Sequence, residues 1–154
     1  MTEHKFARQR VGDGLRLFGH WMDAAKVYAA KQIGLHPTDL ASLGYIAMAS
    51  EPLNPKQIIA YLGVSSGSGT ALLDRLELAG YIKRKPNPQD RRGVLIELDR
   101  DKAAEPIAFY QYLQRTYVEA MDRFTPDQLN TIAEFLEAVG TVPFDTQLGR
   151  ALAD

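Results

Sequence analysis

The chain has 154 residues, of which 45% are hydrophobic and 24% are charged, and its formal net charge is −1. This length and composition predict one globular domain, or one domain plus an extension, and exclude a wholly disordered chain. The absence of cysteine excludes disulfides, thiolate catalysis and most structural zinc sites.

The sequence carries no sign of a membrane or export segment. No apolar run approaches the ~20 residues that cross a bilayer. The polar start MTEHKFARQR is unlike a signal peptide. A cytoplasmic location is therefore expected.

Charge is distributed unevenly along the chain. Residues 56–98 carry a net charge of +3, whereas residues 99–154 carry −5. The cations are densest in KRKPNPQDRR, residues 83–92, which holds five bases and one acid. This asymmetry fits a polyanion partner for one surface. It equally fits a solvated charged face, and charge alone does not decide between the two.

Residues 4–33 are predicted to form one long helix. Apolar side chains recur there at spacings of three and four, and a second apolar stripe lies beside the first. A helix that is apolar over so much of its circumference must be covered on more than one side, and a partner subunit could supply one cover. The two stripes are Val11, Leu15, Phe18, Met22, Ala25 and Ala29, and Leu17, Trp21, Ala24 and Tyr28.

Three further helices follow at short intervals. Pro37 in HPTDL suits the first position of a helix that runs to about residue 47. In NPKQ, Asn54 and Gln57 form a capping-box pattern before a short helix that ends at Leu62. After a tight turn, Ser65 can cap a helix that runs to about residue 79 and stops at a glycine.

The period then changes to that of strands. Tyr81 and Ile82 begin one strand, and the alternation of Val94, Ile96 and Leu98 predicts its partner. Prolines at 86 and 88 are expected to prevent regular pairing near the turn, which predicts a hairpin with a long, basic tip.

Helical periodicity returns over about residues 102–124. TPDQ at 125–128 repeats the Thr-cap and capping-box pattern before a last helix that ends at Gly140, and the tail after it carries few signals. The predicted fold is therefore mainly α with a small two- or three-stranded β wing: a winged helix-turn-helix flanked by helices. A helix fits the DNA major groove, and a basic hairpin beside it can reach phosphates or the minor groove.

Residues 62–98 resemble the MarR family of winged-helix transcriptional regulators. The resemblance rests on four segments that match the family pattern without a gap: Leu62-Gly63-Val64-Ser65, Asp74-Arg75-Leu76-Glu77, Gly80 and Asp90-Arg91-Arg92. Each motif alone is weak, but all of them at this spacing are a strong signal. With the helices before and after, the similarity covers about residues 10–140.

The resemblance implies an obligate homodimer that binds a pseudo-palindromic operator in double-stranded DNA, with recognition helices ~34 Å apart. Residues 1–35 and 102–154 would form the helical dimerisation region, and residues 36–100 the winged helix-turn-helix. A ligand-responsive repressor is expected, released from DNA by a small aromatic or phenolic effector.

Candidate DNA contacts lie on the recognition helix and the wing. Leu72, Leu73, Leu76 and Ala79 should face the core, as should Gly69, which gives up a packed side chain there. Many members of the family carry Arg or Lys at the positions of Ser66 and Ala71. The wing is therefore expected to supply much of the affinity for DNA. Asp90 would orient an arginine through a charge-assisted hydrogen bond. The alternative is that these residues form an ordinary solvated polar surface without a DNA contact. The candidates are Ser65, Ser66, Gly67, Ser68, Thr70, Arg75, Arg84, Lys85, Asp90, Arg91 and Arg92.

Candidates for an effector pocket are aromatic side chains and histidines, for which plain packing is the alternative role. No paired carboxylates, Ser-His-Asp arrangement, metal-ligand spacing or cofactor motif is present, so neither an enzyme nor a cofactor is expected. The alternative function is that of a small-molecule-binding or protein-interaction module with the same fold and with weak or no specific DNA binding. The pocket candidates are His20, Trp21, Tyr28, His36 and Tyr45.

Overall fold

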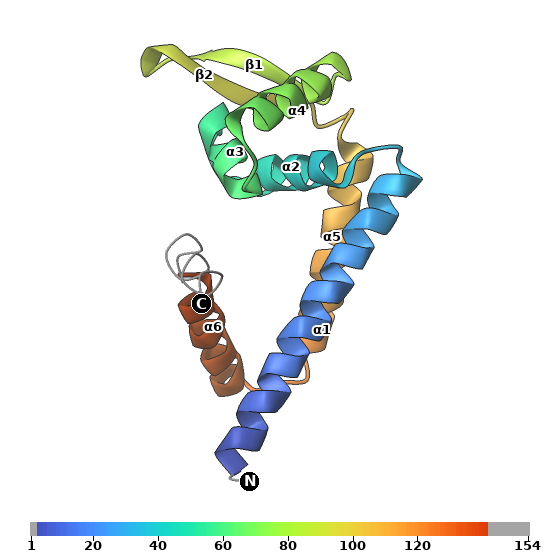
Figure 1. Ribbon diagram of the computed structural model, residues 1–154, viewed down its shortest axis with the longest axis vertical. Coiled ribbons are helices and arrows are strands. Elements are labelled where there is room, and N and C mark those ends of the chain that lie inside the picture. Colours follow the sequence, from blue (N-terminus) through green and yellow to red (C-terminus); the bar gives the residue numbers. More distant parts are fainter. Residues whose placement is uncertain (1–2, 142–154) are drawn as a thin grey trace, which may run out of the picture. The chain divides into compact units, whose positions relative to one another are not determined.

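The computed structural model describes residues 3–141, apart from the side chain of Arg91. Over these residues the chain forms six helices and one antiparallel hairpin (Figure 1). It divides into two compact units, one ending at Gln111 and the other beginning at Tyr112. The elements are α1 Glu3–Gln32, α2 Pro37–Met48, α3 Pro55–Leu62, α4 Ser66–Leu78, β1 Ile82–Asn87, β2 Asp90–Leu98, α5 Ala104–Met121 and α6 Pro126–Gly140.

Local sequence signals set the helix boundaries, as predicted. At α3, Asn54 Oδ1 accepts from the N–H of Gln57 at 3.0 Å, and Gln57 Oε1 accepts from the N–H of Asn54 at 2.8 Å. The same reciprocal pair opens α6. Gly63 ends α3 with φ of 63°, and Gly80 follows α4 with φ of 80°, conformations that glycine adopts without steric cost.

The winged helix-turn-helix has one continuous hydrophobic core. It draws on α2, α3, α4 and both strands, which explains why Leu72, Leu73 and Leu76 are buried as predicted. The prediction for Ala79 is wrong: the helix ends at Leu78, so Ala79 is its exposed C-cap. The core residues are Leu43, Ile46, Leu53, Ile58, Leu72, Leu73, Leu76, Ile82 and Ile96.

The hairpin is more regular than the sequence suggests. Pro86 pairs with Val94, the register shifts only after Pro86, and Asn87 pairs with Asp90. The turn is therefore residues 88–89, and the prediction of a long tip is wrong. Both strands of a two-stranded sheet are edges, where a residue without an N–H is tolerated. An isolated bridge joins Leu53 to β2, which makes the wing locally three-stranded.

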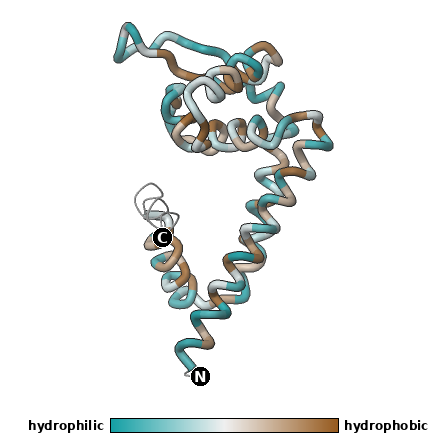
Figure 2. Tube along the Cα trace, viewed as in Figure 1, coloured by the Kyte–Doolittle hydropathy of each residue, from teal (hydrophilic) through white to brown (hydrophobic). Residues whose placement is uncertain are grey.

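A second, smaller cluster lies at the α1–α2 corner. Ala29 and Ala30 of α1 and Leu40 of α2 are buried there, with Phe109 and Tyr110 packed against them. Further back along α1, and on α6, large apolar side chains are exposed, and hydrophobic residues recur along both helices in Figure 2. Within residues 3–141, no helix is long and apolar enough to span a bilayer.

Candidate nucleic-acid interface

Helix α4 presents a small and exposed outer face. Its N-cap is Ser65, whose hydroxyl accepts from the N–H of Ser68 at 3.2 Å and donates to the Ser68 hydroxyl at 2.9 Å. Thr70 donates its hydroxyl to the carbonyl of Ser66 at 2.9 Å. The hydroxyls keep acceptor capacity for an outside donor, since each oxygen has two lone pairs. Ser66, Gly67, Thr70, Ala71 and Asp74 are all exposed.

Gly69 sets how closely the two helices of the motif approach. It is buried, and a Cβ at this position would lie 2.8 Å from Ile59 Cδ1 and closer still to Ile59 Cγ1. The expectation that Gly69 simply gives up a packed side chain is therefore incomplete, because Ile59 of α3 fills that space. Only a glycine allows this separation of α3 and α4.

Arg75 ties α4 to α2. Its guanidinium donates from Nε to Asp39 Oδ2 at 3.1 Å and from Nη2 to Asp39 Oδ1 at 2.5 Å. The Asp39 side chain is 5% exposed, whereas that of Arg75 is 53% exposed. This hydrogen bond raises the pKa of Arg75 above its ordinary value. The guanidinium predicted to meet DNA thus already has a structural partner, and its DNA contact stays a prediction.

Arg84 ties the wing to α4. Its guanidinium donates to Asp74 Oδ1 at 2.6 Å and also pairs with Glu77, whose Oε1 accepts the backbone N–H of Arg84 at 3.0 Å. Burial lowers the pKa of Arg84, but the hydrogen bonds that its guanidinium donates to Asp74 and Glu77 outweigh burial and raise the pKa above its ordinary value. Its predicted contact with DNA also stays a prediction.

The other cations at the base of the wing have acidic partners too. Lys83 lies 3.3 Å from Asp99, and Lys85 lies 3.2 Å from Glu97 on β2. Exposed pairs of this kind contribute little stability, about 0–1 kcal/mol, but they reduce the positive field of the strand.

Arg92, near the tip, differs from the cations at the base. Among the described side chains it has no ion-pair partner. Asp90 Oδ1 accepts the backbone N–H of Arg92 at 2.9 Å, so this carboxylate stabilises the local backbone, and its expected contact with an arginine guanidinium stays a prediction. The side chain of Arg91 lies outside the described residues.

A groove of about 370 Å³ lies between the tip and the start of α3. Two cations, Lys56 and Arg92, and one acid, Asp90, are among the residues that line it. Lys56 was not among the predicted DNA contacts. A signal was present, because a lysine in the first turn of a helix opposes the macrodipole, which favours acids there. The groove therefore has a net positive lining, past which a phosphodiester strand could run.

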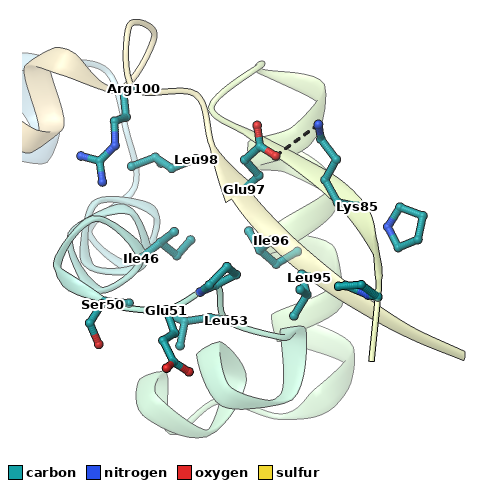
Figure 3. Close-up of a pocket in the computed structure, with 14 residues that line it drawn as sticks. Ile46, Ser50, Glu51, Leu53, Lys85, Leu95, Ile96, Glu97, Leu98 and Arg100 are labelled. Carbon is teal, nitrogen blue, oxygen red and sulfur yellow. Dashed lines mark ion pairs between the residues drawn. The ribbon is translucent and has the colours of Figure 1, made fainter. Parts of the chain in front are cut away.

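A larger cavity, of about 470 Å³, lies between the end of α2 and the wing (Figure 3). Its apolar wall comes from Ile46, Leu53 and Leu95, and the Lys85–Glu97 ion pair lies at its edge. Neither this cavity nor the groove contains a predicted pocket residue.

The predicted pocket residues do not come together within the single chain. His20, Trp21 and Tyr28 are exposed along α1. His36 is the N-cap of α2, where Nδ1 accepts the N–H of Thr38 at 3.3 Å. Tyr45 stacks on Tyr61 with ring centroids 3.8 Å apart. Their role in effector binding stays a prediction.

Comparisons with known proteins agree with this geometry. The sequence model of the MarR family matches residues 33–93. YcgE, an uncharacterized HTH-type transcriptional regulator of Bacillus subtilis, is 34% identical over 108 residues, 70% of this chain and 70% of that protein. The multiple antibiotic resistance protein MarR of Escherichia coli is 31% identical over 110 residues, 68% of this chain and 76% of that protein.

Solved structures show the same fold. Wild-type MarR from E. coli in its apo form superposes with a TM-score of 0.59 at 27% identity, covering 83% of this chain and 94% of that one. S. aureus MepR in its DNA-binding conformation gives a TM-score of 0.70 at 18% identity, covering 84% and 95%.

Proposed function

Because the chain belongs to the MarR family of transcriptional regulators, we propose that it is a homodimeric repressor that a small molecule releases from duplex DNA. The observation that carries the proposal is the pairing of a small, exposed face on α4 with a groove lined by Lys56 and Arg92. The α4 face is free of bulky side chains over its first turns, so the helix can approach base edges closely in the major groove.

In this proposal the recognition helix and the wing make different contacts. Ser65, Ser66, Ser68 and Thr70 meet base edges or phosphates through hydroxyls, and Gly67 lets the backbone come close. Arg92, with Arg91, enters the minor groove, where the electrostatic potential is most negative.

The exposed apolar surface of the helices supports a dimer. On α1, Leu17 is 71% exposed and Phe18 is 49% exposed, and on α6, Leu136 is 49% exposed. No residue of α6 is buried. Large apolar side chains exposed in such number on a helix are typical of an interface between chains. We assign residues 1–35 and 102–154 to dimerisation and residues 36–100 to DNA binding. A two-fold dimer then matches a pseudo-palindromic operator.

Effector release requires that the small molecule bind one arrangement of the two wings more tightly than the other. An aromatic or phenolic effector is the proposed class. The exposed His20, Trp21 and Tyr28 on α1, with His36 and Tyr45, are the proposed contacts once a second chain covers them.

A second function is favoured by the charge of α4. Its one basic residue is Arg75, which is paired with Asp39, so the recognition helix offers no unpaired cation of its own. A regulator with so little positive charge could bind DNA weakly and act through small molecules or proteins instead.

Titration with a labelled duplex from upstream of the protein's own gene separates the two functions. A specific dimer should prefer this duplex to an unrelated one. Its affinity should fall about 10³-fold or more between 50 and 200 mM salt, as expected for six or more phosphate contacts. Phenols and aromatic acids should then weaken binding when added. Absent or salt-insensitive binding by a folded dimer would instead favour the second function.

A further inference from the structure

Arg84, Asp74 and Glu77 form a charged cluster that links the wing to the recognition helix. One guanidinium bridges the two carboxylates, with Nη2 at 2.6 Å from Asp74 Oδ1 and Nη1 paired with Glu77. Glu77 also accepts the backbone N–H of Arg84 at 3.0 Å, so the strand itself is held, not only its side chain. The Arg84 side chain is 28% exposed, well below the 61% of Asp74.

The cluster contains all the acids of α4. Residues 66–78 hold two acids, Asp74 and Glu77, and one base, Arg75. Because Arg75 is committed to Asp39, Arg84 is the cation that compensates both acids. Asp74 lies on the same exposed face as Ser66 and Thr70, so without Arg84 its charge would stand within a Debye length of DNA phosphates.

Strand alternation explains why this one cation is different. Successive side chains of a strand point to opposite faces. Lys83 and Lys85 lie on one face of β1 and pair with Asp99 and Glu97. Arg84 lies on the other face and reaches α4. A single position of the basic segment is therefore built to hold the recognition helix.

We propose that Arg84 is a positioning residue that neutralises the acidic end of the recognition helix and fixes the wing against it, and does not contact phosphate. This proposal rests on the proposed DNA binding. Like charges that face one another across an interface weaken binding. Without a compensating cation, the carboxylates of Asp74 and Glu77 would therefore repel the phosphates of the duplex. Part of the positive charge of the wing thus serves to cancel carboxylates of the protein itself.

The test is a rescue experiment on the full-length dimer. Arg84→Ala should weaken binding to the upstream duplex by about tenfold or more, because it exposes both carboxylates. Asp74→Asn with Glu77→Gln removes both charges but leaves an acceptor oxygen at each position, now that of an amide, and should bind at least as tightly as wild type. The triple variant should recover to within about threefold of wild type. A triple variant as weak as Arg84→Ala would overturn the proposal.

Two further measurements separate neutralisation from direct contact. Loss of one phosphate contact lowers the salt slope of log K by about 0.9. Arg84→Ala should leave the slope nearer the wild-type value, and a full drop would contradict the proposal. Lys83→Ala removes the same charge from the same strand, but from the Asp99 pair, and should change affinity by less than about threefold.

Folding and function are distinguished by readouts without DNA. Thermal unfolding and sedimentation show whether each variant remains a folded dimer. In Arg84→Ala, amide exchange of residues 82–87 should accelerate while that of α2 stays unchanged, because the wing loses its link to α4. Unchanged exchange in the wing would overturn the positioning role. A wild-type protein that binds no duplex contradicts the proposed function alone, and the exchange result then decides the positioning role by itself.

Discussion

Arg75 of the recognition helix donates two hydrogen bonds to Asp39 in the first turn of α2, at 3.1 Å and 2.5 Å. The two residues are 36 positions apart in the chain. The buried carboxylate also lies near the positive end of the α2 dipole. The orientation of the recognition helix is therefore fixed by a charged contact as well as by the leucines of its core face.

Arg75→Ala should destabilise the fold by about 1–3 kcal/mol, because it leaves the Asp39 carboxylate buried without its partner. Asp39→Leu combined with Arg75→Met should recover much of the loss, since replacing both partners of a buried pair by apolar residues is often nearly neutral. Urea unfolding measures both free energies. The contact is not structurally important if Arg75→Ala unfolds at the wild-type midpoint.

Gly67 and Gly69 should respond to alanine in opposite directions. Both are in α4, but a Cβ at Gly67 meets nothing within 4 Å, whereas at Gly69 it meets Ile59 at 2.8 Å and closer. Gly67→Ala should stabilise by about 0.5–1 kcal/mol through helix propensity. Gly69→Ala should destabilise by about 1–3 kcal/mol through overpacking.

A double variant at Gly69 and Ile59 tests the overpacking explanation directly. Ile59→Ala removes the atoms that a Cβ at Gly69 would meet, so the double variant should be more stable than the sum of the two single changes predicts. Strict additivity in urea unfolding would contradict the close packing of α3 on α4.

Much of the fold follows from signals that are local in sequence. The boundaries of α3 and α6 were predictable because the cap and its partner are three residues apart, as in Asn54 and Gln57. The hairpin tip was predicted wrongly, because the effect of Pro86 depends on which strand edge faces its nitrogen. That is a property of the sheet and not of the segment.

The candidate site was predictable by residue type but not by pairing. The sequence indicates a basic wing, yet it does not say that Arg84 turns back to Asp74 and Glu77 while Arg92 does not pair among the described side chains. Nor does it bring Lys56 beside Arg92, because their proximity depends on how α3 packs against the hairpin. Contacts between distant segments need the tertiary structure.

Lys56→Ala and Arg92→Ala should each weaken DNA binding without unfolding the protein. Arg92→Ala should cost about tenfold or more in affinity, and Lys56→Ala should lower the salt slope by about 0.9, the value for one phosphate contact. Lys31→Ala, which removes an exposed cation from the end of α1, is the matched control and should change neither. Anisotropy titrations at several salt concentrations measure both quantities. Unchanged affinity in Arg92→Ala would remove the wing tip from the mechanism.

The packing of Tyr110 on Gly44 predicts a loss of stability in alkali. A Cβ on Gly44 would lie 2.7 Å from Tyr110 Cδ2 and closer to the ring edge, so α5 approaches α2 closely at this glycine. Burial, with a smaller effect from Tyr61, raises the pKa of the Tyr110 hydroxyl in the folded protein. The ordinary value in an unfolded chain is about 10.

The direction of this pH dependence follows from the number of protons that the folded and unfolded chains bind. Above pH ~10 the unfolded chain has released the Tyr110 proton while the folded chain still holds it, so the free energy of unfolding falls as pH rises. Tyr110→Phe keeps the ring on Gly44 and should flatten this decline. Tyr112→Phe removes an exposed hydroxyl from the same helix and should retain the decline. Urea unfolding between about pH 8 and pH 11 tests the difference. If the Tyr110→Phe protein loses stability as steeply as wild type, the alkaline transition belongs to another group.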